Sequence, residues 1–274
     1  MSAVATSGAQ HVLAALLEAR TGQQLGPARG WRLDTTLKPL FGELGVESLD
    51  ELAMHLLDGQ HPRLADRVVD ALLNGETSFF RDPGVFDSVA TALATSDGRR
   101  LRLWSAGCST GQEALSLAMQ WAERGGTVPE IVATDLSETA VARARAGRYT
   151  QFEIQRGLSV GRMIRWFENK ADCWVARAEL LRHVVYRRQN LLIEPAPLGQ
   201  FDAVFCRNLL FYLAPPARRQ ALERLAGALR PGGVLVLGAG ETVIGQSDAF
   251  QPSQRFRGLY EPIPRPWPQR ATSA

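Results

Sequence analysis

Beyond residue 86 the chain alternates short apolar runs with helical segments, and this rhythm limits its possible folds more than any other feature. The alternation favours a mostly parallel sheet with helices on both faces, because a helix is the usual crossover between parallel strands. We therefore expect an α/β fold with a doubly wound sheet over residues 86–261. The apolar runs lie at 101–104, 131–134, 184–187, 203–206 and 234–237.

The flanking regions follow other patterns. Apolar positions recur at helical spacing between residues 9 and 73, which predicts an N-terminal helical domain over residues 1–85. The stretch at about 150–188 is too long for one crossover and is rich in Arg, which indicates an inserted subdomain with a basic face. From 262 to 274 Pro alternates with polar residues, so we expect a linker or tail.

Charge and cysteine content argue against several function classes. The formal net charge is +3, without the Lys/Arg block of a dedicated nucleic-acid binder. Cys108, Cys173 and Cys206 lack the paired spacing of a zinc site or disulfide framework. No apolar run approaches the roughly 20 residues that span a bilayer, and no signal-peptide pattern is seen. We expect no metal, no nucleic-acid partner, no direct membrane insertion and a cytoplasmic location.

A glycine turn joins the first strand to the helix that follows it. Gly107 and Gly111 let the backbone approach a ligand closely, and the helix N-terminus presents free N–H groups. By itself the turn is equally consistent with simple chain reversal. Support comes from Asp135, which ends the second strand, near the position where a carboxylate accepts ribose hydroxyls.

The glycine spacing narrows the ligand class. A dinucleotide site normally shows G-x-G-x-x-G, which seats a pyrophosphate, whereas this turn reads G-x-x-x-G. An adenosine compound without phosphates fits better. Arg207 and Asn208 follow another strand, at the sheet edge where open sheets bind ligands, although both residues are also consistent with capping the next turn.

Four motifs in order connect the chain to a known family. They read NGETSFFRD at 74–82, WSAGCSTGQE at 104–113, FCRNLLFY at 205–212 and LRPGG at 229–233. With these motifs the chain resembles the CheR family of chemotaxis receptor methyltransferases from about residue 60 to 261. The resemblance implies a class I S-adenosylmethionine-dependent methyltransferase domain with an N-terminal helical domain and a small β-rich insertion.

The resemblance also implies which residues contact S-adenosylmethionine and its product, S-adenosylhomocysteine. Asp135 is expected to hold the ribose. Gly75 departs from the family, because many members place Asn two residues before the Thr and the nearest Asn here is Asn74. The other expected cofactor contacts are Thr77, Arg81, Gly107, Glu113, Asn190, Leu191, Arg207 and Asn208.

The implied reaction is esterification of glutamate side chains on the cytoplasmic methylation helices of chemoreceptor-like proteins. A glutamate has a usual pKa of about 4.3, so at neutral pH it is already the nucleophile and needs no general base. Arg81 is expected to bridge the methionine end of the cofactor and the incoming carboxylate, and Tyr212 to hydrogen-bond the substrate oxygen that does not attack. The structural alternatives are an Arg81–Asp82 ion pair and a core position for Tyr212 beside Phe211.

Other functions stay open on the sequence alone. One is a small-molecule carboxyl methyltransferase, and another is a catalytically silent cofactor-binding scaffold. The basic insertion, with Arg162 and Arg165 among its charges, would attract an acidic receptor helix, and its alternative is a solvated charged face.

Overall fold

A mostly parallel sheet forms the centre of the computed structural model, which describes residues 7–26, 30, 32–94, 99–197 and 199–263. In these residues it has seven strands in the order β6-β2-β1-β7-β8-β10-β9. The strands are β1 (Arg102–Ala106), β2 (Glu130–Asp135), β6 (Val184–Arg188), β7 (Phe201–Cys206), β8 (Leu229–Leu237), β9 (Phe250–Pro252) and β10 (Leu259–Pro262). The expected tail begins inside β10, and residues 264–274 lie outside the described part.

The strand order confirms the predicted doubly wound sheet. Strands β6, β2, β1, β7 and β8 pair in parallel, whereas β10 pairs antiparallel with both β8 and β9 at one edge of the sheet. The chain proceeds from β1 outward through β2 to β6, then returns to β7 on the other side of β1. The order therefore reverses between β1 and β7, and open sheets bind ligands outside the carboxyl ends of strands at such a point.

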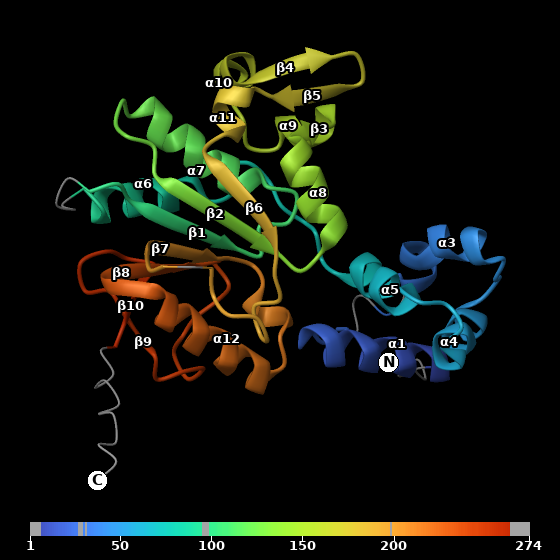
Figure 1. Ribbon diagram of the computed structural model, residues 1–274. Helices are drawn as coiled ribbons and strands as arrows, with labels where there is room; N and C mark the ends of the chain where they lie inside the picture. The colour runs from blue at the N-terminus through green and yellow to red at the C-terminus, as the bar shows by residue number, and fades with distance from the viewer. Residues whose placement is uncertain (1–6, 27–29, 31, 95–98, 198, 264–274) are drawn as a thin grey trace, which may run out of the picture.

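Alternate side chains along the strands pack against helices on opposite faces of the sheet. Leu103 packs with the layer of α6 (Pro83–Ala92), α7 (Gln112–Glu123) and α8 (Glu138–Ala146), whereas its neighbour Trp104 packs with α12 (Pro215–Ala228) on the other face. Figure 1 shows α6 and α7 on one side of the sheet and α12 on the other. The strands are therefore apolar on both faces, as parallel strands require.

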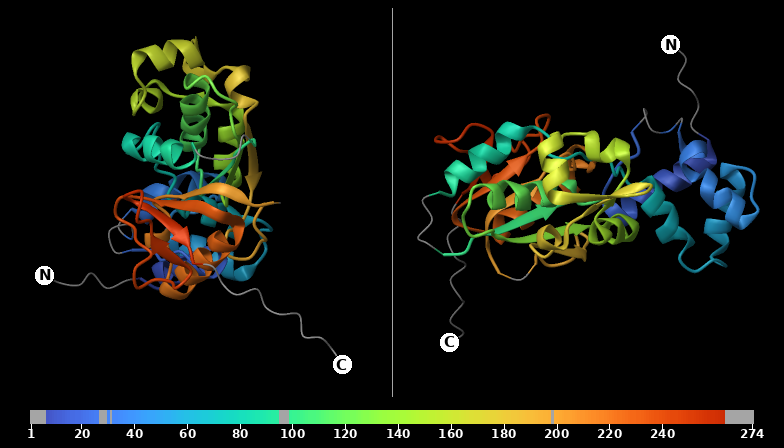
Figure 2. Two further views of the ribbon diagram at one scale, coloured as in Figure 1. Left: turned by 90° about the vertical axis from the view of Figure 1, so that its left-hand side faces the viewer. Right: turned by 90° about the horizontal axis from the view of Figure 1, so that it is seen from above.

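The N-terminal helices have a core of their own. Ser7 caps the first of them in a capping box, and Leu13, Leu37 and Val68 are fully buried among them. They lie off the carboxyl ends of β1 and β2 (Figures 1 and 2). The helices are α1 (Gly8–Thr21), α3 (Leu33–Leu44), α4 (Leu49–Asp58) and α5 (Leu64–Leu72).

A small antiparallel sheet, in the order β3-β5-β4, forms the insertion above α7 and α8 (Figure 1). Its first strand follows α8 directly. Residues 184–188 fall within the expected insertion of about 150–188, but they form β6 of the central sheet, as the apolar run at 184–187 predicted, because they pair in parallel with β2. The insertion contains β3 (Arg148–Tyr149), α9 (Gln151–Gln155), α10 (Val160–Trp166), β4 (Phe167–Lys170), β5 (Cys173–Ala176) and α11 (Ala178–Leu181).

None of the helices in the described ranges is both long enough and apolar enough to span a membrane.

Candidate active site

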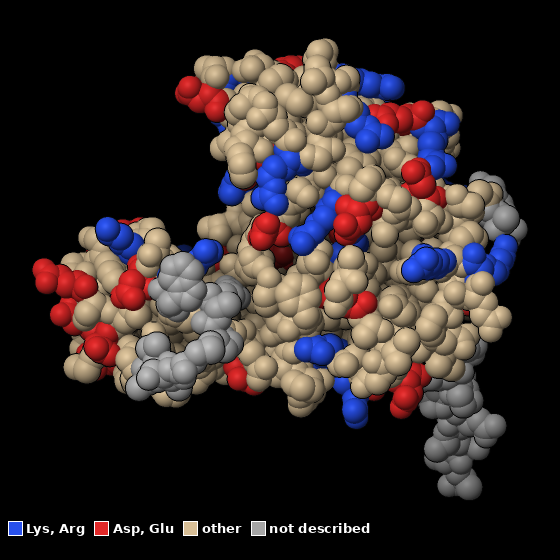
Figure 3. Space-filling model, turned by 180° about the vertical axis from the view of Figure 1, so that it is seen from behind, with Lys and Arg blue, Asp and Glu red and all other residues tan. Residues whose placement is uncertain are grey.

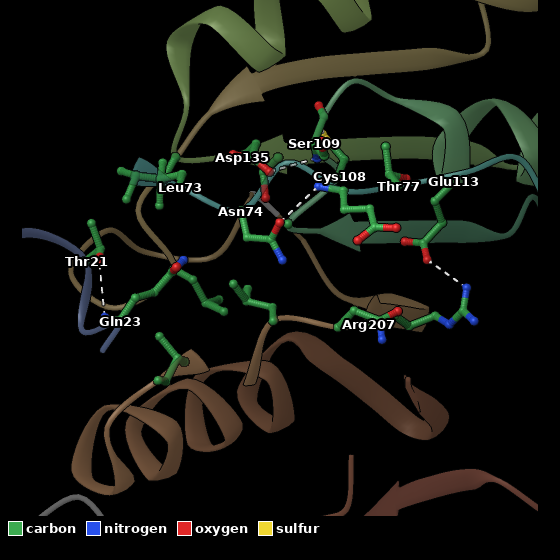
Figure 4. A pocket seen from close by; sticks show the side chains of 18 of the residues that line it. Thr21, Gln23, Leu73, Asn74, Thr77, Cys108, Ser109, Glu113, Asp135 and Arg207 are labelled. Atoms are coloured by element: carbon green, nitrogen blue, oxygen red, sulfur yellow. Dashed lines mark hydrogen bonds and ion pairs between the residues drawn. The ribbon is translucent and has the colours of Figure 1, made fainter. Parts of the chain in front are cut away.

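One pocket lies at the carboxyl ends of β1, β2 and β7, next to the ends of α1 and α5 (Figure 4). Every residue expected to contact the cofactor lines it, and Tyr212 does not. The strand order explains this convergence, because it brings the ends of three parallel strands to one edge of the sheet. The expected contacts in the lining are Thr77, Arg81, Gly107, Glu113, Asp135, Asn190, Leu191, Arg207 and Asn208.

The glycine turn has an unusual backbone. Gly107, Ser109 and Gly111 have φ values of 82°, 48° and 92°, all in the left-handed region. A Cβ on Gly111 would lie 2.9 Å from the Cβ of Ala144, so this position requires glycine. A non-glycine residue in this region costs about 1–3 kcal/mol, and Ser109 therefore needs support from its surroundings.

Asp135 supplies part of that support. Its Oδ2 accepts a hydrogen bond from the Ser109 N–H at 2.7 Å, and its Oδ1 accepts one from the Ser137 N–H at 2.9 Å. Burial raises the pKa of Asp135, and these hydrogen bonds oppose the rise without cancelling it. Each carboxylate oxygen has a further lone pair, so Asp135 can accept ribose hydroxyls while it holds the turn.

A buried ion pair forms the wall beneath the turn. The Arg207 side chain is 3% exposed, and its Nη1 lies 3.2 Å from Glu113 Oε2, as Figure 4 shows. Its Nη2 bonds Asp82, while its Nε has no partner among the described residues. Glu113 also accepts a hydrogen bond from the Ser105 hydroxyl at 2.7 Å. Two carboxylates around one guanidinium leave a net negative charge, which favours a cationic ligand group nearby.

Arg81 is oriented differently from its neighbour Asp82. Asp82 pairs with Arg207, so the ion pair between Arg81 and Asp82 that the sequence left open does not form. The Arg81 side chain lines the pocket, and the described part of the chain offers its guanidinium no ion-pair partner. Arg81 is therefore a lining residue whose charge no described acid neutralises in an ion pair.

Tyr212 lies beside the pocket, in the short turn Leu210–Tyr212. Its hydroxyl accepts a hydrogen bond from Asn74 Nδ2, and Asn74 is itself a lining residue. The Tyr212 ring lies 4.2 Å from that of Phe211, which is 46% exposed, so this aromatic pair is not part of the core.

Gly75, where many family members have Asn, lies next to Asn74 in the same segment. The Gly75 carbonyl accepts a hydrogen bond from the Ser109 hydroxyl at 2.8 Å and so joins the two walls of the pocket. A Cβ at Gly75 would lie 3.6 Å from Ser109 Oγ and meet no other heavy atom of the described residues within 4 Å, so the backbone leaves room for a side chain to begin there. Asn74 provides an amide at the pocket in this chain.

Asn190 connects the pocket to the N-terminal helices. Its Nδ2 donates to the Arg20 carbonyl at 3.1 Å and its Oδ1 accepts from the Leu192 N–H at 2.9 Å. Much of the side-chain amide is thus used within the protein. Leu191 and Leu192 add apolar surface to the lining.

Several lining and supporting residues were not predicted from the sequence. Thr21 and Gln23 at the end of α1, and Leu73 after α5, line the pocket, but no local motif marks them. Glu241 accepts hydrogen bonds from the N–H groups of Asn208, at 2.7 Å, and of Leu209, at 2.9 Å. The signal for Glu241 was its place just past a strand that ends at the same sheet edge.

The thiol in the turn is not a reactive group. Burial is the main cause that raises the pKa of Cys108, so this thiol stays protonated at neutral pH. Within the described ranges no three His, Cys, Asp or Glu side chains are grouped as a metal site requires.

Known proteins resemble this chain over most of its length. A family model described as CheR methyltransferase, SAM binding domain, matches residues 75–258. Chemotaxis protein methyltransferase Cher2 of Pseudomonas putida is 36% identical over 256 residues, which cover 89% of this chain and 93% of that protein. Chemotaxis protein methyltransferase 1 of Pseudomonas aeruginosa is 37% identical over 258 residues, with the same coverage. A chemotaxis protein methyltransferase of Vibrio parahaemolyticus is 35% identical over 245 residues, covering 86% of this chain and 89% of that protein.

Proposed function

This chain belongs to the CheR methyltransferase family, and from that premise we propose that it methylates glutamate side chains of chemoreceptor-like proteins. The methyl donor is S-adenosylmethionine, in agreement with the SAM binding domain that matches residues 75–258. The observation that carries the proposal is similarity to chemotaxis methyltransferases over 89% of the chain. The pocket at the sheet edge supports it independently.

The lining fits this cofactor better than it fits a phosphate compound. The charged lining residues are Glu76, Arg81, Glu113, Asp135 and Arg207, which give a net charge of −1 with three acids and two bases. A phosphate would meet mostly carboxylates. A methionine end carries both an ammonium and a carboxylate, which complement the acids and the guanidiniums respectively.

We assign each part of the cofactor to residues of matching chemistry. Asp135 would accept the ribose hydroxyls, Leu191 would cover the adenine, and Glu113 would accept from the ammonium group. A Cβ on Gly107 would lie 3.1 Å from the Leu209 side chain, so glycine lets this lining residue pack against the turn. Arg81 would pair with the methionine carboxylate. Thr77, Asn190, Arg207 and Asn208 complete the proposed set.

When bound, the cofactor supplies a methyl group on a cationic sulfur. An ionised glutamate attacks it directly, so the protein mainly has to hold the carboxylate in line and exclude water. Arg81 would attract the incoming carboxylate, and the Tyr212 hydroxyl, fixed from the pocket side by Asn74, would bond the oxygen that does not attack.

The proposed partner is an acidic methylation helix in the cytoplasm. Figure 3 shows Asp and Glu side chains at the outer end of the N-terminal helical domain and several Lys and Arg side chains below the insertion. An acidic helix is therefore expected near the insertion. Arg162 already pairs with Glu123 at 2.7 Å and stacks over Phe80 at 3.9 Å, so the proposed docking does not depend on it.

The two alternatives from the sequence are not favoured. Three relatives named as chemotaxis protein methyltransferases are 35–37% identical to this chain, which makes a small-molecule substrate the weaker explanation. A silent scaffold would not need an arginine in the pocket lining that has no ion-pair partner among the described residues, as Arg81 is.

The first experiment is calorimetric titration with S-adenosylhomocysteine. We expect micromolar binding by the wild-type protein and its loss in Asp135→Ala, with Asp248→Ala, an exposed acid away from the pocket, as the matched control. A receptor fragment should then accept labelled methyl groups only while its glutamates are intact. A folded wild-type protein that does not bind S-adenosylhomocysteine would contradict the proposal.

A further inference from the structure

Two walls of the pocket contain backbone conformations that need external support. Ser109 in the glycine turn has a φ of 48°, and Phe80 and Asp82 in the opposite wall have φ values of 44° and 54°. Non-glycine residues adopt this region only where surrounding contacts hold them there. Both walls also carry proposed cofactor contacts, so their backbone positions set the shape of the site.

The insertion contacts both walls directly. Tyr149 of β3 donates a hydrogen bond from its hydroxyl to the Thr110 carbonyl in the glycine turn, at 2.9 Å. The Arg156 carbonyl, just after α9, accepts a hydrogen bond from the Phe79 N–H at 3.1 Å. Gly157 approaches the same wall so closely that a Cβ would lie 1.8 Å from the Phe79 carbonyl oxygen.

Ring packing joins these two contacts into one unit. The Phe79 ring meets Tyr149 edge-on at 5.0 Å and Phe167 of β4 at 5.5 Å. All three side chains are at most 1% exposed. A shift of the insertion would therefore move both walls, because close-packed rings transmit displacement.

A second buried tyrosine, Tyr186, packs near the turn without a hydrogen bond from its hydroxyl to any described residue and so provides a comparison for Tyr149. Tyr186 of β6 belongs to the same apolar cluster as Tyr149, but its hydroxyl has no hydrogen-bond partner in the described part of the chain. It lies 3.0 Å from where a Cβ on Gly111 would stand, so it also touches the turn. The two tyrosines differ mainly in the hydrogen bond from Tyr149.

We propose that Tyr149 is a positioning residue for the cofactor, which makes the insertion a structural part of the cofactor site. The proposal rests on the function proposed above. Without the Tyr149 hydroxyl, the buried Thr110 carbonyl loses its donor, and the turn populates conformations that bind the cofactor poorly. The apparent Kd then rises in inverse proportion to the competent fraction.

The test compares Tyr149→Phe with Tyr186→Phe in the full chain. Phenylalanine keeps the ring contacts and removes only the hydroxyl. Titration with S-adenosylhomocysteine should give a Kd about three- to tenfold higher for Tyr149→Phe, the equivalent of one buried neutral hydrogen bond. Tyr186→Phe should stay within about twofold of wild type, because it removes a hydroxyl without a partner.

Kinetics separate positioning from general destabilisation. In Tyr149→Phe the KM for S-adenosylmethionine should rise with the Kd, while kcat at saturating cofactor is retained. A lower melting temperature with unchanged Kd and KM would overturn the inference, and so would equal weakening by Tyr186→Phe. Either result would leave the proposed function intact as long as the wild-type protein binds S-adenosylhomocysteine. Failure of the wild-type protein to bind would contradict both the proposed function and the positioning role of Tyr149.

Discussion

The two ends of the parallel sheet use buried charge in opposite ways. At the amino ends, Asp202 of β7 is 3% exposed and is bonded by Arg99 and Arg230. At the carboxyl ends, Arg207 is equally buried beside Glu113, yet its Nε has no partner among the described residues. The charges at the amino ends pair only within the protein, whereas Arg207 and Glu113 at the carboxyl ends also line the pocket. The first arrangement serves stability and the second serves binding.

The aspartates at the two ends of the sheet, Asp202 and Asp135, show the same contrast in the direction of their pKa shifts. Burial alone would raise the pKa of Asp202, but hydrogen bonds, led by that from Arg99, hold it below its usual value of 3.8. Burial raises the pKa of Asp135 above 3.8, and the neutral hydrogen bonds it accepts, led by that from Ser137, do not offset this. A guanidinium compensates a buried carboxylate, and a backbone N–H does so only in part.

The largest expected effect is at the close contact between the insertion and the pocket wall. Gly157→Ala should lower the free energy of unfolding by about 2–5 kcal/mol, because its Cβ would meet backbone and its φ is 96°. Gly161→Ala is the control, since a Cβ there meets nothing within 4 Å. Urea unfolding measures both, and equal stabilities would show that the contact is not tight.

Asp202→Asn should show that the amino ends of the sheet affect stability and not cofactor binding. Removing this charge leaves Arg99 and Arg230 without their carboxylate, and we expect a loss of about 2–4 kcal/mol in stability, reduced by the partial exposure of both arginines. The Kd for S-adenosylhomocysteine should not change, because the cluster lies at the far end of the sheet. Weaker binding by the folded variant would mean that the two ends are coupled.

Tyr212→Phe, beside the pocket at the carboxyl ends of the strands, should lower turnover without changing cofactor binding. Loss of one hydrogen bond to the substrate carboxylate is expected to lower kcat about tenfold, with the Kd for S-adenosylhomocysteine unchanged. Arg81→Ala should lower turnover as well and should also weaken cofactor binding. Initial rates on a receptor fragment test both, and wild-type rates in either variant would remove that residue from the mechanism.

The last prediction concerns the pH dependence of cofactor-product binding and of stability. As the pH falls through the raised pKa of Asp135, protonation should weaken S-adenosylhomocysteine binding up to tenfold per unit. In the interval between 3.8 and that raised pKa, Asp135 binds more protons folded than unfolded, so its contribution to stability falls as the pH rises.

The contribution of Asp202 to stability changes with pH in the opposite direction to that of Asp135. Its contribution to stability is fully present above 3.8 and is lost as the pH falls through its lowered pKa. Binding should therefore weaken at a pH where Asp202 still stabilises the fold. Calorimetry and thermal melts at matched pH measure the two curves, and coincident midpoints would contradict the contrast.

The sequence by itself determined the sheet and the main elements of the pocket. Apolar periodicity located the five parallel strands, because periodicity reports which faces of an element are buried. The turn at Gly107 and Gly111, with Asp135 at the next strand end, marked the edge of the sheet where the pocket lies. These signals are local, so they survive without tertiary information.

Only the tertiary structure decided which groups pair. In the folded chain Asp82 forms an ion pair with Arg207, Tyr212 lies beside the pocket, and Tyr149 hydrogen-bonds the glycine turn. The tertiary structure also assigned Arg162 to Glu123, where the sequence had suggested a surface charge for docking. The physical reason is that a hydrogen bond or ion pair depends on which segments the fold brings within about 3 Å, and no local pattern records that distance.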